Sequence, residues 1–271
     1  MSDPSAPLEP AAGRLAPGER VSLLWAITIA GFSAWLLVGS AYAATKVAEH
    51  GTPATQASTQ PLSYTPYETV ILGVIGSCAV ALTIIASNIL VRPGGLRRLG
   101  LGERALPRGL LIGVAASLIV IPLVYGSAMA TQKVWDALGL EYPTAHPLLR
   151  IMDQQHSDAL LRSMVIISAI LLAPLSEELL FRAQLQTAFR YTLDNTATRA
   201  LPALAAVLLT SAVFTLFHGE FWMMPPIFLL SLILGWVYER TRNLWATIVI
   251  HACFNASSVA YFLWQRPPAH H

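Results

Sequence analysis

Long apolar segments dominate this chain and predict helices that cross a membrane. Seven such segments can be traced, and the stretches between them hold almost all of the charged residues. Several run for seventeen to twenty-four residues without Lys, Arg, Asp or Glu, enough for an α-helix to cross roughly 30 Å of hydrocarbon. We therefore expect an all-α fold, a polytopic transmembrane helix bundle of about seven spans. The spans are expected at residues 21–44, 70–91, 109–130, 163–181, 201–217, 226–238 (short, with 221–225 as an extension) and 244–264.

The other stretches suggest how the chain is organised around these spans. Residues 1–20 are rich in Pro, Ala and Gly and predict a disordered cytoplasmic tail. The region 21–130 holds three spans and no diagnostic motif. Residues 131–162 mix apolar and charged positions, which is typical of an amphipathic helix lying at the membrane interface between the third and fourth spans. The remaining four spans lie in 163–264, which we expect to form the core of the protein, followed by a short tail at 265–271.

Composition supports a membrane protein and gives no reason to expect a nucleic acid partner. Hydrophobic residues make up 55% of the chain and charged residues only 12%, whereas a soluble domain has about 25% charged residues. The net charge of +2 is too weak to indicate binding to nucleic acid. Cys78 and Cys253 lie in separate apolar segments, so we expect them to be reduced core residues without a disulfide or a CxxC metal motif.

Loops on alternate sides of the predicted spans differ in their basic residues. Twelve of the 17 Lys and Arg residues fall in the N-terminal tail and in loops 92–108, 182–200 and 239–243, and five fall on the other side. Cytoplasmic loops carry the excess of Lys and Arg. We therefore expect a multi-pass protein of a bacterial inner membrane, with its N-terminus in the cytoplasm and its C-terminus outside.

Two acidic residues interrupt the fourth apolar segment. Of the 15 Asp and Glu residues, only Glu177 and Glu178 fall within a predicted span. Ionisable groups in hydrocarbon cost several kcal/mol and usually mark a functional site with a partner nearby. Glu178 is four residues from Arg182 and can pair with it, which gives both a structural role. Glu177 is five residues away and pairs poorly, so it is the better candidate for chemistry; the alternative is that both acids cap the end of this span.

Two further polar pairs lie in the later spans. Phe214 and His218 are one helical turn apart, so the phenyl ring can pack beside the imidazole and support it, although a lone His at a span end is often an interface residue. His251 and Asn255 have the same spacing and share one face of the seventh span. Buried His and Asn side chains need hydrogen-bond partners. Polar groups on three apolar helices therefore predict one shared cluster.

Together these three motifs resemble a known family. EExxxR at Glu177–Arg182, FxxxH at Phe214–His218 and HxxxN at His251–Asn255 have the order and rough spacing of the CPBP intramembrane proteases, also called the ABI family. That family includes the type II CAAX prenyl endopeptidases and bacteriocin-processing or self-immunity proteins. The resemblance covers about 164–260 and implies an intramembrane endopeptidase. Ala183 stands where the family commonly has Gly, so the approach of helices there is expected to differ slightly.

Hydrolysis of a peptide bond in a membrane needs a base to activate water and donors to hold the oxyanion. Glu177 is the natural base. The resemblance implies that Glu177 and His218 position and activate the water, and that His251 and Asn255 donate to the oxyanion. An amide suits that task because its NH₂ group donates without titrating. The expected partner is a membrane-associated peptide or protein, either a prenylated CAAX-type substrate or one with a leader peptide.

A metalloprotease is the alternative mechanism. His218, His251 and Glu177 would supply three ligands to zinc and leave the fourth position for water. The chain lacks an HExxH motif, Asn255 is a poor zinc ligand, and using Glu177 as a ligand would remove the base. We therefore expect no cofactor and keep zinc as the alternative.

Other classes of protein fit the sequence less well. An aspartyl dyad is excluded because no Asp lies in a predicted span, and neither Ser257 nor Ser258 lies in a nucleophile elbow. A non-catalytic immunity or scaffold protein of the same fold has no evident need for the whole polar set. An ion-coupled transporter with a relay from Glu177 to His218 would be expected to show inverted repeats, and none is visible.

The depth of His218 conflicts with this topology. Glu177 and His251 are expected toward the cytoplasmic half of the membrane, whereas His218 falls near the outer end of its span. Either the fifth helix begins later than its hydropathy suggests, or residues 218–225 remain within the membrane and extend that helix.

Overall fold

The protein is a bundle of long helices. A computed structural model describes residues 17–50, 64–91, 95–141, 147–153, 158–194 and 200–265. Across these residues the regular structure is helical and no strand occurs. Seven helical stretches are long and apolar enough to cross a membrane, which confirms the prediction of an all-α bundle with about seven spans. Most of the two predicted tails, residues 1–16 and 266–271, lies outside the described residues.

Six of the seven candidate spans are built on single long helices. These are α1 (Pro17–His50), α2 (Pro66–Val91), α4 (Ala105–Ala137), α9 (Ala200–His218), α10 (Met224–Thr241) and α11 (Leu244–Trp264). The fourth span combines α6 (Ala159–Ile167), the π-helical segment η2 (Ser168–Leu172), α7 (Ala173–Glu177), a second π-helical segment η3 (Glu178–Gln186) and α8 (Thr187–Thr192). Short helical pieces complete the described chain: α3 (Gly95–Arg98), α5 (Pro147–Arg150), η1 (Ile151–Asp153) and η4 (Phe221–Met223).

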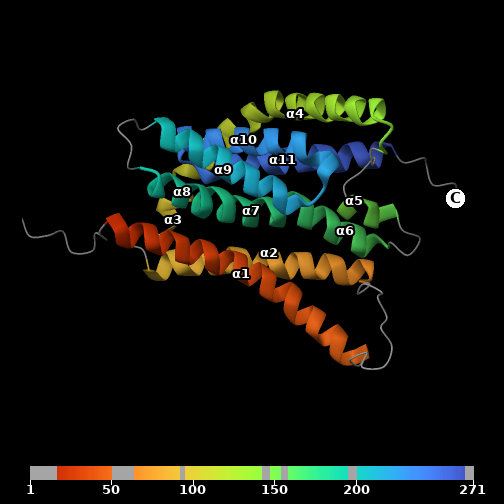
Figure 1. Ribbon diagram of the computed structural model, residues 1–271, viewed down its shortest axis with the longest axis horizontal. Helices are drawn as coiled ribbons and strands as arrows, with labels where there is room; N and C mark the ends of the chain where they lie inside the picture. Colours follow the sequence, from red (N-terminus) through yellow and green to blue (C-terminus); the bar gives the residue numbers. More distant parts are fainter. Residues whose placement is uncertain are drawn as a thin grey trace, which may run out of the picture.

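The fourth span lies in the middle of the bundle. Figure 1 shows α7 and α8 between α1 and α2 on one side and α9, α10, α11 and α4 on the other. All nine residues of η3 are buried, among them the charged pair Glu178 and Arg182. Leu179, Leu180 and Phe181 belong to the main hydrophobic core, which also includes residues of α1, α2 and α9–α11. The central position places the acidic motif where every other span can contribute side chains to it.

Small residues bring α4 close to α11, the helix that carries His251. A Cβ atom at Gly109 would lie 2.5 Å from the Cβ of Trp245, and one at Gly113 would lie 2.5 Å from the Cβ of Val249. The two glycines are four residues apart and so face the same neighbour, as in small-xxx-small contacts between membrane helices. The third span therefore supports α11 even though it carries none of the three motifs.

The segment predicted to lie at the interface has two parts. Its first residues continue α4 as far as Ala137, so they belong to the long third helix. Further on, α5 and η1 bury Leu149, Ile151 and Met152 in a second hydrophobic cluster, together with Leu161 of α6 and other residues. Residues 142–146 and 154–157, which flank these two elements, lie outside the described residues.

Candidate active site

Both acidic residues of the fourth span lie beside the imidazole of His251. Nδ1 of the ring is 3.1 Å from Oε1 of Glu178, and Nε2 is 3.8 Å from Oε2 of Glu177. A carboxylate can only accept, so Nδ1 of His251 donates the hydrogen bond to Glu178. Glu178 and His251 are buried, whereas the side chain of Glu177 is 28% exposed. Glu177 is therefore the more accessible of the two carboxylates, while its Oε2 atom, which faces His251, is buried and has no hydrogen-bond partner among the described residues.

A fully buried guanidinium neutralises the inner carboxylate. Nε of Arg182 lies 3.3 Å from Oε2 of Glu178, and neither side chain is exposed. The predicted pairing of these two residues is therefore observed. The guanidinium also lies over the ring of Phe214, 4.6 Å from its centroid, and donates from Nη2 to the hydroxyl of Ser231 at 3.2 Å. Burial of a charge is tolerated only with such partners.

Phe214 joins the two histidines. Its ring centroid is 4.5 Å from that of His218 and 6.0 Å from that of His251. Its backbone carbonyl is 2.8 Å from Nδ1 of His218, so the carbonyl accepts a hydrogen bond from the ring. The expected packing of Phe214 beside His218 is thus present, and Nε2 of His218 remains available. In the described chain, no hydrogen bond or ion pair joins His218 directly to Glu177.

The C-terminal end of α9, which carries His218, packs against the fourth span. The ring of Phe214 meets that of Phe181 in η3 edge to face at 4.9 Å, and Figure 1 shows α9 ending part-way along the bundle. The chain then turns at Gly219, whose φ is +69°, and η4 leads directly into α10. Residues 221–241 form one candidate span. The second explanation left open by the sequence, in which residues 218–225 extend the fifth helix, is wrong, because α9 ends at His218 and residues 221–241 belong to the next candidate span.

Asn255 contacts the backbone of the fourth span instead of the acidic residues. Its Nδ2 donates to the carbonyl of Ala169 at 2.8 Å. Ala169 lies in η2, where the N–H of residue i+5 bonds to the carbonyl of residue i, as Ala173 does to Ser168. The next donor in this series would be residue 174, which is Pro174 and has no N–H. The amide of Asn255 therefore satisfies the carbonyl that Pro174 leaves free, and its second N–H is not used by this bond.

The sequence predicts an α-helix for the fourth span and does not predict its two π-helical segments, η2 and η3. π-Helical turns are rare and are often found at functional sites. Pro174 was the one available signal, because it removes a backbone donor from the middle of an apolar run. The sequence did not predict the contact of Ser231 with Arg182 either. A serine in an apolar span usually donates to a backbone carbonyl of its own helix, and no sequence pattern separates the two cases.

The residues present do not fit the zinc site that the sequence left open at Glu177, His218 and His251. Within the parts of the chain that the structure describes, no group of three or more His, Cys, Asp or Glu side chains could hold a metal ion. Nδ1 of each histidine already has a partner, the carboxylate of Glu178 or a backbone carbonyl, so only Nε2 of either ring could bind a metal ion. We derive no step through a metal.

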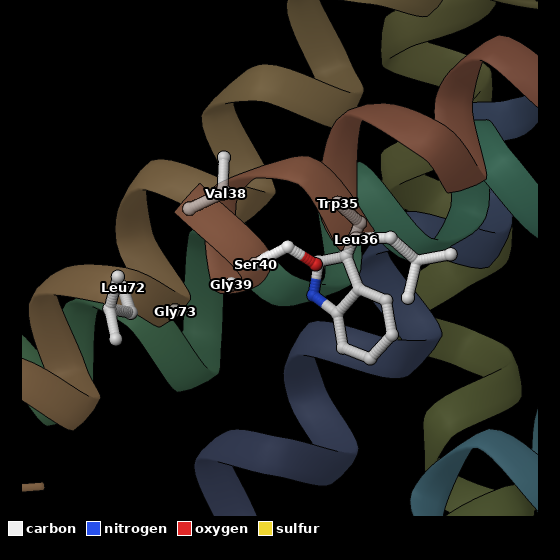
Figure 2. A pocket seen from close by; sticks show the side chains of 7 residues that line it. All are labelled: Trp35, Leu36, Val38, Gly39, Ser40, Leu72 and Gly73. Atoms are coloured by element: carbon white, nitrogen blue, oxygen red, sulfur yellow. The ribbon is translucent and has the colours of Figure 1, made fainter. Parts of the chain in front are cut away.

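A separate hollow of about 370 Å³ lies between α1 and α2. Figure 2 shows its lining: Trp35, Leu36, Val38, Gly39, Ser40, Leu72 and Gly73. None of these residues titrates. The ring of Trp35 lies 5.8 Å from that of Phe217, the neighbour of His218 in the chain, so one wall of the hollow contacts the end of α9. It offers apolar space and no chemistry of its own.

Comparison with known proteins identifies a family that matches the segment carrying the three motifs. Residues 159–257 match the family described as type II CAAX prenyl endopeptidase Rce1-like. The resemblance predicted from the three motifs is confirmed over this segment. The match includes Glu177, His218, His251 and Asn255, and it supports a CAAX-type intramembrane protease as the kind of function.

A curated relative is similar over a shorter stretch. The chain is 33% identical over 86 residues to the UPF0177 protein YxdF of Lactococcus lactis subsp. lactis (strain IL1403). The similarity covers 31% of this chain and 42% of the relative, so the chain spans less than half the length of that protein. No solved structure gave a significant match.

Proposed function

We propose that this protein is an intramembrane endopeptidase that hydrolyses a peptide bond of a membrane-associated substrate, with Glu177 as the base. The observation that carries the proposal is the arrangement of Glu177, His251 and Glu178. An acid–histidine–acid set, buried at Glu178 and His251 and backed by Arg182, has no evident use in a protein that only spans the membrane. The family match of this segment supports the same function.

The gap between Glu177 and His251 suits a reacting oxygen. The distance of 3.8 Å is too long for a direct hydrogen bond, yet one oxygen atom can lie about 2.8 Å from both Oε2 and Nε2. Glu177 takes a proton from a water molecule held there, and the oxygen attacks the substrate carbonyl. The C–N bond then breaks, and Glu177 returns the proton to the leaving amine.

Three other side chains complete the proposed mechanism. Glu178 accepts from Nδ1 of His251 and fixes the ring so that Nε2 faces Glu177. Because Nδ1 already carries a proton, donation from Nε2 to the oxyanion requires the doubly protonated ring, whose Nε2–H would stabilise the oxyanion together with the second N–H of Asn255. Nε2 of His218, on the other side of Phe214, would help to position the water. These roles follow the family resemblance and are compatible with the contacts.

The expected substrate enters from the membrane and is cut toward the cytoplasmic side, in a protein whose N-terminus lies in the cytoplasm. The family description favours a prenylated CAAX peptide, and a leader peptide is the second substrate to test. The test uses the full chain in liposomes, with a farnesylated CAAX peptide and an unprenylated leader peptide as probes. Comparison of membrane proteomes from cells with the wild type and with Glu177→Ala would identify a natural substrate by its accumulation.

Glu177→Gln should reduce hydrolysis about 10²- to 10⁴-fold, because the amide keeps the shape and cannot act as a base. Glu103→Gln, at an exposed position between α3 and α4, is the matched control and should leave the rate unchanged. Folded Glu177→Ala protein with an unchanged membrane proteome would favour the non-catalytic scaffold. Loss of hydrolysis with a chelator, restored only by Zn²⁺, would show that the metal-free mechanism is wrong.

A further inference from the structure

Two rows of residues face each other between the fourth and sixth spans, both with a spacing of four. One row lies on η3 and α8 and comprises Glu178, Arg182, Gln186 and Arg190. The other lies on α10 and comprises Ser231, Gly235 and Glu239. Equal spacing lets successive members of the two rows meet along the whole contact.

The contacts form a continuous polar series. After the bond from Arg182 to Ser231, the side chain of Gln186 donates from Nε2 to the carbonyl of Gly235 and to Oε1 of Glu239, both at 3.0 Å. Nε of Arg190 lies 3.8 Å from Oε2 of Glu239. The series therefore begins at the proposed catalytic cluster and ends at the tip of α10.

Close approach of the two helices makes the bond to Ser231 possible. A Cβ atom at Gly235 would lie 3.0 Å from Oε1 of Gln186 and 3.0 Å from Cγ1 of Val207. Glycine at this position thus lets α10 lie against η3. One turn earlier on α10, Ser231 is fully buried and lies within hydrogen-bond distance of Arg182.

Ser231 is the single hydrogen-bond acceptor of the Arg182 guanidinium among the described residues. Nε and Nη1 are both buried and have no hydrogen-bond partner there, although Nε lies near the carboxylate of Glu178. The guanidinium carbon lies over the ring of Phe214, a contact that fixes none of its N–H groups by a hydrogen bond. The hydroxyl of Ser231 supplies such a hydrogen bond at Nη2.

We propose that Ser231 is a positioning residue of the peptidase reaction, acting through Arg182 and Glu178 on His251. Held by Ser231, the guanidinium keeps the Glu178 carboxylate oriented so that Oε1 accepts from Nδ1 of His251. The ring then presents Nε2 to Glu177. This inference rests on the proposed function, because it assigns Ser231 to that same reaction.

The test compares Ser231→Ala with Ser117→Ala in the full-length protein in liposomes. Ser117 is also a buried serine in a span, but its hydroxyl bonds only to a carbonyl of its own helix, so it controls for loss of a buried hydroxyl. With the farnesylated CAAX peptide as the probe, Ser231→Ala should lower kcat about tenfold and leave KM nearly unchanged. Ser231→Thr keeps the hydroxyl and should restore most of kcat.

A second measurement does not depend on cleavage of any substrate. In protein labelled with ¹⁵N at histidine, the ring signals of His251 report which nitrogen carries the proton, and they can be assigned by their absence in His251→Gln. The wild type and Ser117→Ala should show a proton on Nδ1 and one set of signals. Ser231→Ala should add a second set, because Glu178 then adopts more than one orientation.

The outcomes separate this inference from the proposed function. If Ser231→Ala matches Ser117→Ala in its histidine signals, Ser231 is not a positioning residue, whatever the enzyme cleaves. An altered His251 signal in Ser231→Ala, with no cleavage of either the farnesylated CAAX peptide or the leader peptide by the wild type, would support the coupling and contradict the peptidase. If Ser231→Ala lowers kcat as much in an Arg182→Lys background as in the wild type, Ser231 does not act through Arg182.

Discussion

The side-chain amide of Asn255 donates to the backbone carbonyl of Ala169, five residues before a proline that cannot supply that bond. The contact ties the last span to the π-helical part of the fourth span. It also gives Asn255 a structural task in addition to the one proposed for it in the reaction. Because the amide carries two N–H groups, one side chain can serve both.

This relationship predicts an energetic coupling between Asn255 and Pro174. Asn255→Ala should lower the free energy of unfolding by about 1–3 kcal/mol, since it leaves a buried carbonyl without a donor. In a Pro174→Ala background the same change should cost less, because residue 174 then has its own N–H for Ala169. Denaturant unfolding of the four proteins in micelles measures the coupling. Equal costs in both backgrounds would show that the amide does not replace the missing backbone donor.

The buried pair of Glu178 and Arg182 should behave as a unit. Arg182→Met should cost about 3–5 kcal/mol of stability, because it leaves a fully buried carboxylate without its cation. Adding Glu178→Gln should recover much of that loss by removing the charge, yet activity should stay low because Arg182 no longer holds residue 178. Thermal unfolding and peptide hydrolysis are measured on the same samples. An active double variant would contradict the supporting role of Arg182.

Contact between α4 and α11 should depend on Gly113. Gly113→Ala places a methyl group 2.5 Å from the Cβ of Val249, so the helices must separate and the melting temperature should fall. Gly126→Ala is the matched control, because a Cβ at that position of α4 meets nothing within 4 Å. The control should keep or slightly raise the melting temperature. If both variants melt alike, close contact at Gly113 contributes nothing to stability.

Asp158 should make the stability of the protein depend on pH in the acidic range. Its carboxylate caps the start of α6, and the Leu161 N–H, at 2.8 Å, and the Tyr67 hydroxyl, at 2.7 Å, lower its pKa from the ordinary value of 3.8. A carboxyl with a lowered pKa contributes stability above its unfolded pKa, and the contribution is lost as pH falls through the folded value.

Asp158→Asn keeps a capping side chain and removes the titration. The difference in melting temperature between wild type and Asp158→Asn should therefore be constant above about pH 5 and shrink as the pH falls below about 4. Circular dichroism in micelles from pH 2.5 to 6 measures it. A difference that grows toward low pH would have the wrong sign for this capping interaction.

Much of the site could be predicted from spacing alone. Residues four apart on a helix share a face, so the pairs Glu178–Arg182 and Phe214–His218 followed directly from the sequence, and both contacts are present. Which partner His251 takes did not follow, because it depends on how α11 packs against the fourth span. The sequence interpretation placed His251 with Asn255 as a donor pair, whereas its nearest charged partners are Glu177 and Glu178.

The sequence by itself determined the class of fold, the number of spans and the three motifs. Charged residues are costly in hydrocarbon, so spans appear as apolar runs in the sequence and the few polar residues inside them stand out. Only the tertiary structure decided the π-helical turns and the partners of His251, Asn255 and Ser231. Each of these depends on hydrogen bonds between helices far apart in the chain. A donor that Pro174 lacks can be supplied by Asn255, 81 positions later, only once the two spans lie side by side.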